Sequence, residues 1–368
     1  MSVALKKSPF PGVKPSEIAQ QLAGLQKVQK KLPAWFESQG IYYPPVLNLE
    51  QCSSEQTAMY KAGLASGNTL LDLTGGFGVD SYFFSRRLGQ VHYCELDPNL
   101  AEIAAHNFAQ LGAGNIAVHA QSGLEVLEHL LKAGNRPDWI YADPSRRNAR
   151  GSRVVLLEDY QPNIPAHLDR LLASTNNLLL KTSPMLDLAA GSRSLRHIRE
   201  IHVVAIDNEV RELLWWLQPR YDGPCTRIAL DLGKGEPFRF TLGEELAATC
   251  FYALPGAYLY EPHAALMKAA PFCLLGERFG LAKLHRHTHL YTSEELLPFP
   301  GRRFRIREVL PYKASKLAFT KAHVATRNFP ERVEVIRKRT GIKPGGDTYL
   351  FFAKTADDSL KVLVTEAV

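Results

Sequence analysis

The feature that most constrains this chain is an alternation of short apolar runs with helical segments between residues 69 and 206. Segments 101–111 and 124–133 have helical spacing and lie between apolar runs of strand length. Strands that alternate with helices of this size form a parallel sheet covered on both faces. We therefore predict a doubly wound α/β domain, whose strands cover residues 69–73, 90–94, 116–120, 139–142, 177–181 and 202–206.

The segments on either side of this core differ in character. Residues 16–35 have leucine and isoleucine at helical spacing and predict a helix, with Pro33 near its end. Runs 227–232 and 237–242 flank a Gly-Lys-Gly turn and predict a closing hairpin. We expect the two tryptophans within 213–217 to be helix or core aromatics. A length of 368 residues predicts two or three domains.

Positive charge is concentrated in the last third of the chain. The formal net charge is +7, and residues 251–368 alone hold 19 lysines and arginines against 11 aspartates and glutamates. Either a solubilising surface or a module that faces a polyanion would have this charge.

Several other features of the sequence indicate the cellular compartment of the protein. No apolar run approaches the ~18 residues that span a bilayer, so we expect no membrane partner. No apolar segment follows the two lysines near the N-terminus, and a secretory signal is not expected. Five scattered cysteines argue against a disulfide framework and against a zinc site. The expected compartment is a reducing cytoplasm.

A glycine-rich loop follows the first predicted strand. A loop of this kind between a strand and a helix lets a ligand approach the backbone at the carboxyl edge of the sheet. Glu95 falls about twenty residues later, at the end of the second predicted strand, where its carboxylate can take both ribose hydroxyls. The pattern predicts a nucleotide site.

Two common ligands of such a site differ in charge. A dinucleotide loop requires a third glycine, and Ser81 stands in that place, next to Asp80. A carboxylate there would repel a pyrophosphate. Asp72 and Asp80 instead suit S-adenosylmethionine, which has a cationic α-amino group and a cationic sulfonium, although Asp80 could equally be a solvated residue at a helix start.

Over roughly residues 57–245 the chain resembles class I S-adenosylmethionine-dependent methyltransferases. Their first motif is matched by Asp72 and the glycine loop, and their second by Glu95. Ser122 stands where these enzymes usually place an acid near the adenine. The resemblance implies a Rossmann-like, mostly parallel seven-stranded sheet. It also implies cofactor contacts from Asp72, Thr74, Gly75, Gly76, Phe77, Gly78, Asp80, Glu95 and Ser122.

The sequence Asp-Pro-Ser-Arg-Arg at 143–147 follows the fourth predicted strand. It resembles the Asp-Pro-Pro-aromatic motif of amino-group methyltransferases, which implies that Asp143 and the Pro144 carbonyl hold a target nitrogen. Ser145 replaces the second proline, and an ordinary turn is the alternative. Arg146 and Arg147 would suit phosphate contacts. Lys181 and Thr182, after the next predicted strand, either line the acceptor pocket or only end the strand.

The last third resembles the end of bacterial methyltransferases with a small ferredoxin-like unit and a THUMP-like domain. The resemblance rests on Tyr-Glu-Pro-His at 260–263, Phe-Pro-Gly-Arg at 299–302 and Gly-Gly-Asp-Thr-Tyr at 345–349. It implies binding of structured RNA, rRNA or tRNA. The expected domains are an N-terminal helical segment (1–56), the methyltransferase domain (57–250), the ferredoxin-like unit (251–293) and a basic THUMP-like domain (294–368).

The RNA contacts expected in this module are arginines. Arg303, Arg305 and Arg307 would share one face of a strand, and Arg327 adds to the positive surface. Histidines at 285, 287 and 289 could lie on one strand face as metal ligands, but no clear fourth ligand accompanies them. We expect structural or RNA-contact roles for them and no metal.

The sequence thus predicts an enzyme that methylates a base nitrogen in structured RNA with S-adenosylmethionine. Two alternatives stay open. One is a methyltransferase acting on a protein or a small molecule. The other is a non-catalytic RNA-binding protein with a decayed cofactor fold.

Overall fold

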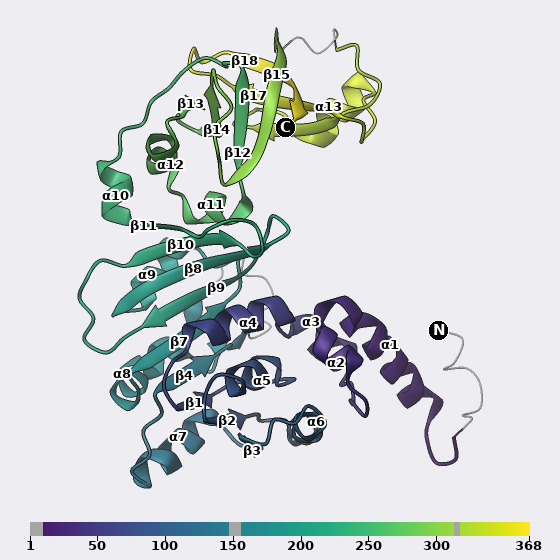
Figure 1. The fold of residues 1–368 in the computed structure, drawn as a ribbon, viewed down its shortest axis with the longest axis vertical. Helices are drawn as coiled ribbons and strands as arrows, with labels where there is room; N and C mark the ends of the chain where they lie inside the picture. Colours follow the sequence, from purple (N-terminus) through teal and green to yellow (C-terminus); the bar gives the residue numbers. More distant parts are fainter. Residues whose placement is uncertain (1–9, 147–155, 313–316) are drawn as a thin grey trace. The chain divides into compact units, whose positions relative to one another are not determined.

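The computed structural model describes residues 10–146, 156–312 and 317–368, and the chain divides into two compact units. The first unit comprises residues 1–201 and 212–223, and the second comprises residues 202–211 and 224–368. Figure 1 traces the helices and strands of each unit along the chain.

The predicted apolar runs form a central sheet. Its strands are β1 (Thr69–Asp72), β2 (Gln90–Cys94), β3 (Ile116–His119), β4 (Trp139–Ala142), β7 (Asn177–Thr182), β8 (Ile198–Ile206), β9 (Glu209–Leu217), β10 (Thr226–Asp231) and β11 (Phe238–Thr241). The strand order is β11-β10-β8-β9-β7-β4-β1-β2-β3. Strands β3, β2, β1, β4 and β7 are parallel, and β9 pairs antiparallel with β7. The predicted Rossmann-like α/β fold is confirmed.

Within the described residues this sheet has nine strands, and the predicted number of seven is wrong. The difference arises because the predicted hairpin, now β10 and β11, extends the sheet beyond β8. The tryptophans at 215 and 216 lie on β9, a strand that the sequence pattern did not reveal. Trp215 is fully buried, as expected of a core aromatic.

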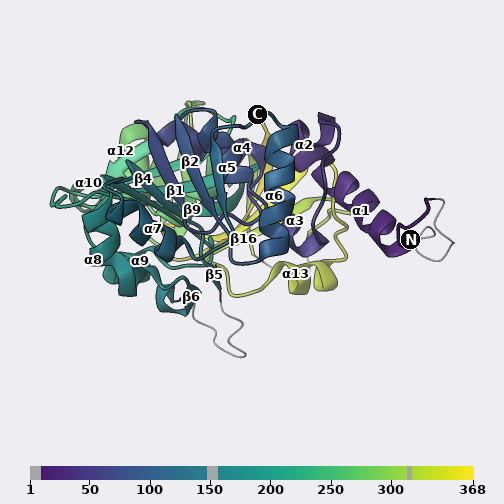
Figure 2. The same ribbon diagram turned by 90° about the horizontal axis from the view of Figure 1, so that it is seen from below.

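Helices cover both faces of the sheet (Figure 2). They are α4 (Glu55–Leu64), α5 (Val79–Ser85), α6 (Pro98–Gln110), α7 (Gly123–Lys132), α8 (Ile164–Ser174) and α9 (Leu188–Ser194). From β1 the strand order runs outward through β2 to β3, then returns past β1 to β4 and β7. Right-handed crossovers in opposite directions place helices on opposite faces. The short elements β5 (Ser145–Arg146), η2 (Leu157–Asp159) and β6 (Tyr160–Gln161) flank the undescribed stretch.

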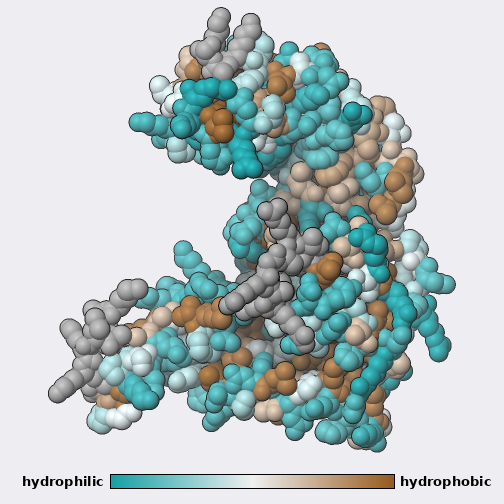
Figure 3. All heavy atoms as spheres, turned by 180° about the vertical axis from the view of Figure 1, so that it is seen from behind, coloured by the Kyte–Doolittle hydropathy of each residue, from teal (hydrophilic) through white to brown (hydrophobic). Residues whose placement is uncertain are grey.

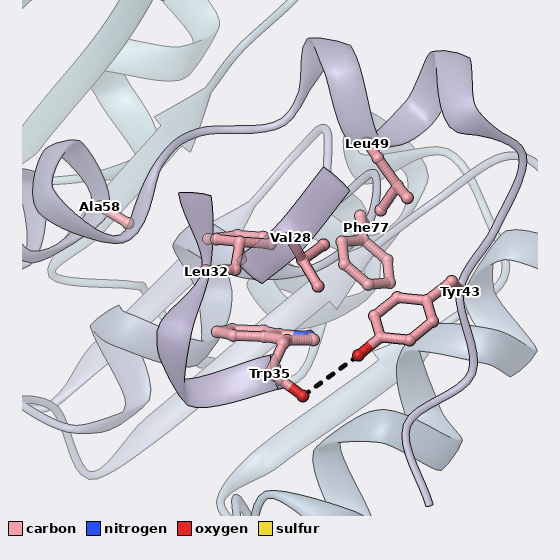
Figure 4. Packing of buried hydrophobic residues seen from close by; sticks show 8 residues of the cluster. Val28, Leu32, Trp35, Tyr43, Leu49, Ala58 and Phe77 are labelled. Atoms are coloured by element: carbon pink, nitrogen blue, oxygen red, sulfur yellow. Dashed lines mark hydrogen bonds between the residues drawn. The ribbon is translucent and has the colours of Figure 1, made fainter. Parts of the chain in front are cut away.

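Three further helices precede this core: α1 (Pro15–Lys31), α2 (Pro33–Glu37) and α3 (Val46–Gln51). The single helix predicted over 16–35 is divided in two: α1 ends at Lys31, and Pro33, which lacks an N–H, starts a new helix. Trp35 is fully buried in a cluster of apolar side chains from these helices (Figure 4). Phe77 and Val79, from the glycine loop and the start of α5, belong to the same cluster. The helices thus pack directly against the loop.

The second unit contains a separate sheet with the order β13-β14-β12-β15-β18-β17-β16. Its elements are α10 (Leu242–Ala247), β12 (Tyr258–Pro262), α11 (Ala264–Ala269), α12 (Phe272–Phe279), β13 (Ala282–His285), β14 (Thr288–Ser293), β15 (Gly301–Pro311), β16 (His323–Arg327), α13 (Val333–Thr340), β17 (Thr348–Lys354) and β18 (Leu360–Ala367). A disulfide joins Cys250 to Cys273, contrary to the expectation from the scattered cysteines.

The described surface is largely polar on the face drawn in Figure 3, where apolar residues occur in small separate patches. Among the helices that the structure describes, none has both the length and the apolar character required to cross a membrane.

Candidate active site

The loop after β1 follows a path that requires glycine at three positions. A Cβ on Gly75 would lie 2.1 Å from the Tyr93 ring, and one on Gly78 would lie 2.5 Å from the Phe108 ring. Gly76 and Gly78 have φ angles of +56° and +85°, which side chains disfavour. The bare backbone that results can approach a ligand closely.

Glu95 holds this loop in place. The Gly76 N–H donates to Glu95 Oε2 at 2.9 Å, and the Asp97 N–H donates to Oε1 at 2.9 Å. The Tyr93 hydroxyl donates to the Gly76 carbonyl at 2.5 Å. Glu95 is only half-buried, and each carboxylate oxygen has a further lone pair for a ligand hydroxyl. The structure therefore brings Glu95 and the glycine loop together.

Asp72 lies beneath the loop and is almost completely buried. The Ser81 hydroxyl donates to its Oδ2 at 2.6 Å, and the Thr74 N–H donates to its Oδ1 at 3.0 Å. Burial raises the pKa of Asp72 to about 7, because these two hydrogen bonds only partly offset the loss of solvation. A cation bound nearby would favour the ionised carboxylate.

Asp80 lies at the start of α5, and its side chain contacts residues outside the glycine loop. Its Oδ2 accepts from Ser53 at 2.8 Å and from the Tyr141 hydroxyl at 2.7 Å, and Lys61 Nζ lies 3.2 Å from its Oδ1. Burial alone would raise the pKa of Asp80, but the ammonium groups of Lys61 and Lys181 lower it below its ordinary value. All these contacts tie Asp80 to the protein interior.

Asp143 lies beside the loop at the end of β4. Its backbone N–H donates to Thr74 Oγ1 at 2.6 Å, which fixes it next to the cofactor loop. Its Oδ2 accepts a hydrogen bond from Lys181 Nζ and forms an ion pair with it. Lys181 reaches this position because β7 pairs with β4 in a register that aligns Leu180 with Ala142. Pro144 is buried.

The other predicted cofactor and acceptor residues occupy different environments. Ser122 precedes α7, is half-buried and makes no side-chain capping bond. The neighbouring Gly123 packs so tightly that a Cβ there would lie 2.6 Å from the Leu73 Cα. The Phe77 ring points into the cluster of the N-terminal helices. Arg146 is in β5, and Arg147 lies outside the described residues.

The predicted RNA-contact arginines of the second unit fall into two groups. Arg307 pairs with Glu366, and Arg327 pairs with the buried Glu261. Arg303 and Arg305 have no carboxylate partner in the described part of the chain, and Arg305 donates to the Tyr258 hydroxyl at 3.2 Å. As predicted, both point away from the buried Phe304.

The three histidines do not form a metal site. His285 Nδ1 lies 3.1 Å from both the His287 N–H and Asn328 Nδ2, so its Nε2 carries the proton toward Asp358 at 3.2 Å. His289 stacks on the Phe272 ring at 3.5 Å, and burial lowers its pKa to about 4. Within the described ranges no cluster of three potential metal ligands occurs.

Sequence reasoning missed a buried ion-pair network beside Asp80. The Lys61 ammonium is fully buried and donates to both oxygens of Glu212, at 2.9 and 3.0 Å. Burial raises the pKa of Glu212. A signal was available, since Glu212 is the one charged residue in the run from 212 to 217. Such a residue on a buried strand requires a partner.

The carboxylates and the bare backbone around the loop fit S-adenosylmethionine. Carboxylates of Asp72 and Glu95 bond the loop, Asp143 adjoins it, and three glycines leave the backbone bare. A ligand with two hydroxyls and two cationic groups matches these acceptors. A pyrophosphate would meet negative charge instead.

Comparisons with known proteins agree with this geometry. A family model described as a ferredoxin-like domain matches residues 258–300, and a model described as THUMP domain-like matches residues 301–367. The crystal structure of a candidate methyltransferase from Porphyromonas gingivalis W83 is 32% identical and superimposes with a TM-score of 0.90. The similarity covers 100% of this chain and 94% of that one.

Two uncharacterized S-adenosylmethionine-dependent methyltransferases of Mycobacterium tuberculosis, from strains CDC 1551 / Oshkosh and ATCC 25618 / H37Rv, are also similar. Each is 26% identical over 269 residues, which is 73% of this chain and 70% of theirs. The chain therefore belongs to the S-adenosylmethionine-dependent methyltransferases that carry a ferredoxin-like unit and a THUMP-like domain at the C-terminus.

Proposed function

We propose that this enzyme methylates structured RNA, rRNA or tRNA, which its C-terminal module presents to the methyltransferase domain. The observation that carries the proposal is the charge of residues 301–367, which hold 15 lysines and arginines against seven aspartates and glutamates. Residues 258–300 hold four of each, so the whole positive excess of the module lies in the THUMP-like part. RNA phosphates are the polyanion that such a surface attracts.

The proposed RNA contacts are the arginines that are not committed to internal ion pairs. Arg305 is exposed on β15 and Arg303 is half-buried there, and neither is paired with a carboxylate among the described residues. Arg307 and Arg327 contribute less, because each charge is already paired. Arg146 and Arg147, next to the acceptor motif, complete the proposed contact set.

The proposed cofactor contacts follow from the geometry of the loop. Glu95 would take the ribose hydroxyls, and the backbone of Thr74, Gly75, Gly76 and Gly78 would lie along the methionine part. Asp72 would face the cationic end of the cofactor from beneath. Phe77 and Asp80, the remaining two residues of the predicted cofactor set, are both buried and would support the loop. Ser122, at the start of α7, would lie near the adenine.

The proposed acceptor site is Asp143 with the Pro144 carbonyl. S-adenosylmethionine supplies an electrophilic methyl group, and the protein must hold a nucleophilic atom in line with it. Positioning of this kind can contribute roughly 7–11 kcal/mol. The Asp143 Oδ1 has no described partner, so it can accept a hydrogen bond from the acceptor. The Asp-Pro pair predicts a base nitrogen, and a hydroxyl is the other acceptor that a carboxylate can hold.

The division of the chain follows the same proposal. The helical segment 1–56 would cover the cofactor loop, and residues 57–250 would catalyse the methyl transfer. Residues 251–293 would connect this catalytic domain to residues 294–368, which would present the RNA. Work on rRNA or tRNA would take place in the cytoplasm.

Nucleoside mass spectrometry tests the RNA substrate. RNA from a strain that lacks this gene is compared with RNA from the parent and from a complemented strain. We expect the loss of one methylated nucleoside in the deletion strain and its return on complementation. An unchanged nucleoside profile would favour a protein or small-molecule substrate. Cofactor binding by the purified protein without transfer to any cellular RNA would favour a non-catalytic RNA-binding protein.

A further inference from the structure

A lysine lies at the proposed acceptor site. Lys181, the fifth residue of β7, donates from its Nζ to Asp143 Oδ2. The Lys181 side chain is 13% exposed and the Asp143 side chain is 30% exposed, so solvent still reaches both members of the pair. The Asp143 backbone is bonded to Thr74, which places the pair next to the cofactor loop.

The Lys181 ammonium is held in its protonated form. Burial alone would lower its pKa, but the negative charges of Asp143, Glu212 and Asp80 raise the pKa above its ordinary value. The hydrogen bond that Lys181 Nζ donates to Asp143 Oδ2 likewise favours the ammonium form, so Lys181 places a positive charge at the acceptor.

A second buried lysine supports this arrangement. Lys61 lies between Asp80 Oδ1 at 3.2 Å and Glu212 Oε2 at 2.9 Å, and it also donates to the Ser53 hydroxyl at 2.9 Å. Lys61 thus pairs directly with Asp80 and Glu212. Lys181 forms its hydrogen bond with the third carboxylate, Asp143.

The charge at the acceptor distinguishes two reactions. An amine nitrogen becomes more positive as it attacks a methyl group, and an ammonium beside it would oppose that change. A hydroxyl oxygen becomes negative as it loses its proton, and an ammonium beside it stabilises that change. A carboxylate next to the same oxygen can accept the proton.

We propose that the acceptor atom is a hydroxyl oxygen, with the Lys181 ammonium stabilising the developing oxyanion and the Asp143 carboxylate taking the proton. The inference rests on the proposed RNA substrate. Each nucleotide within an RNA strand has one free sugar hydroxyl, the ribose 2′-hydroxyl. An oxygen–methyl bond forms while the carbon–sulfur bond breaks, with its electron pair left on sulfur. The hydroxyl proton passes to Asp143 Oδ1. The base nitrogen predicted from the Asp-Pro pair is replaced in this proposal by a ribose oxygen.

The identity of the product tests the inference. Fragmentation of nucleosides in a mass spectrometer shows whether a methyl group is on the sugar or on the base. In RNA from the parent, deletion and complemented strains, we expect the missing nucleoside to be methylated on the ribose. Loss of a base-methylated nucleoside would overturn the hydroxyl acceptor and leave the RNA substrate standing. An unchanged profile would overturn the RNA substrate and this inference with it.

Variants of Lys181 test the role of the charge. We expect Lys181→Met to lower kcat on RNA from the deletion strain by about 10²- to 10³-fold, as loss of one oxyanion donor does. Lys181→Arg should recover part of the rate, because it retains the charge. Calorimetry should give an S-adenosylmethionine Kd within about threefold of the parent for both, which also shows that they fold. The control is Lys27→Met, which removes an exposed lysine paired with Glu50.

An amine acceptor predicts the opposite result for the same variants. In that case Lys181→Met would leave kcat within about threefold of the parent or raise it, because a repulsive charge has been removed. Such a result in a variant that binds the cofactor normally would refute the proposed role of Lys181.

Discussion

Close approaches at single residues decide the shape of the cofactor loop. The Tyr93 ring lies against Gly75, and the hydroxyl of the same tyrosine bonds the Gly76 carbonyl. Glu95 bonds the Gly76 N–H from the other side. The glycines are therefore required by their protein neighbours as well as by the space that a ligand needs.

Gly75→Ala tests this packing. The added Cβ would lie 2.1 Å from a buried aromatic ring, so the loop or the ring must shift. We expect a loss of about 1–3 kcal/mol in the free energy of unfolding and at least a roughly tenfold weaker S-adenosylmethionine affinity, measured by urea denaturation and calorimetry. Gly114→Ala is the control, since no atom lies within 4 Å of its Cβ. Equal effects of both substitutions would contradict the argument.

Asp72 predicts a pH dependence of stability. Its pKa is about 7 in the folded protein, and an unfolded aspartate titrates near 3.9. The folded state thus binds the proton more tightly, so the contribution of Asp72 to stability falls as pH rises from about 4 to about 7. Between about pH 5 and about pH 8 this loss amounts to roughly 3 kcal/mol.

The measurement is urea denaturation of the parent and Asp72→Asn at both pH values. The asparagine variant should gain stability relative to the parent at the higher pH, because it has no charge to bury. A difference between the two proteins that is the same at both pH values would show that Asp72 does not titrate in this range.

At the scale of elements, the N-terminal helices stabilise the cofactor loop. Trp35 on α2 packs edge-on against Tyr82 of α5 with ring centroids 4.9 Å apart, and Phe77 of the loop lies in the same cluster. The Trp35 carbonyl accepts from the Tyr43 hydroxyl at 3.3 Å (Figure 4). The helices therefore support the glycine loop by packing, although none of their residues matches a motif.

Trp35→Ala should destabilise the protein by about 3–5 kcal/mol, the usual cost of removing a buried aromatic side chain. We also expect weaker S-adenosylmethionine binding, because Phe77 loses its packing partner. Calorimetry and denaturation measure the two effects. Phe36→Ala on the same helix is the control, since Phe36 is 36% exposed and should change stability by less than about 1 kcal/mol. Unchanged cofactor affinity in Trp35→Ala would show that the packing of these helices does not affect cofactor binding.

At the scale of the whole molecule, chemistry and positive charge lie in different parts of the chain. The cofactor loop, Asp143 and Lys181 all belong to the first unit. The excess of lysine and arginine belongs to residues 301–367 of the second unit. Substitutions in the basic module should therefore change RNA affinity without changing cofactor affinity.

The double variant Arg303→Glu/Arg305→Glu tests this separation. We expect weaker binding to RNA from the deletion strain and a salt dependence whose slope falls by about one unit for each phosphate that the variant no longer binds. S-adenosylmethionine affinity should stay the same. The matched control is Arg170→Glu/Arg193→Glu, which makes the same charge change on exposed helices of the first unit. Equally weakened binding in both variants would indicate a non-specific charge effect.

Local patterns in the sequence predicted the α/β fold, the glycine loop and the position of Glu95 at the end of β2. They could do so because periodicity, turn residues and the order of strands and helices are properties of neighbouring residues. The same local reasoning placed Asp143 at the end of β4. It also identified the basic character of the last third.

Only the tertiary structure decided which charges meet. Lys61 and Glu212 are 151 residues apart, and Lys181 and Asp143 are 38 apart, so their pairing depends on strand order and register. Asp80 stands at the start of α5, and its ion pair with Lys61 likewise joins residues of two different helices. A buried charge must find a partner wherever the packed chain provides one, and no local pattern contains that information.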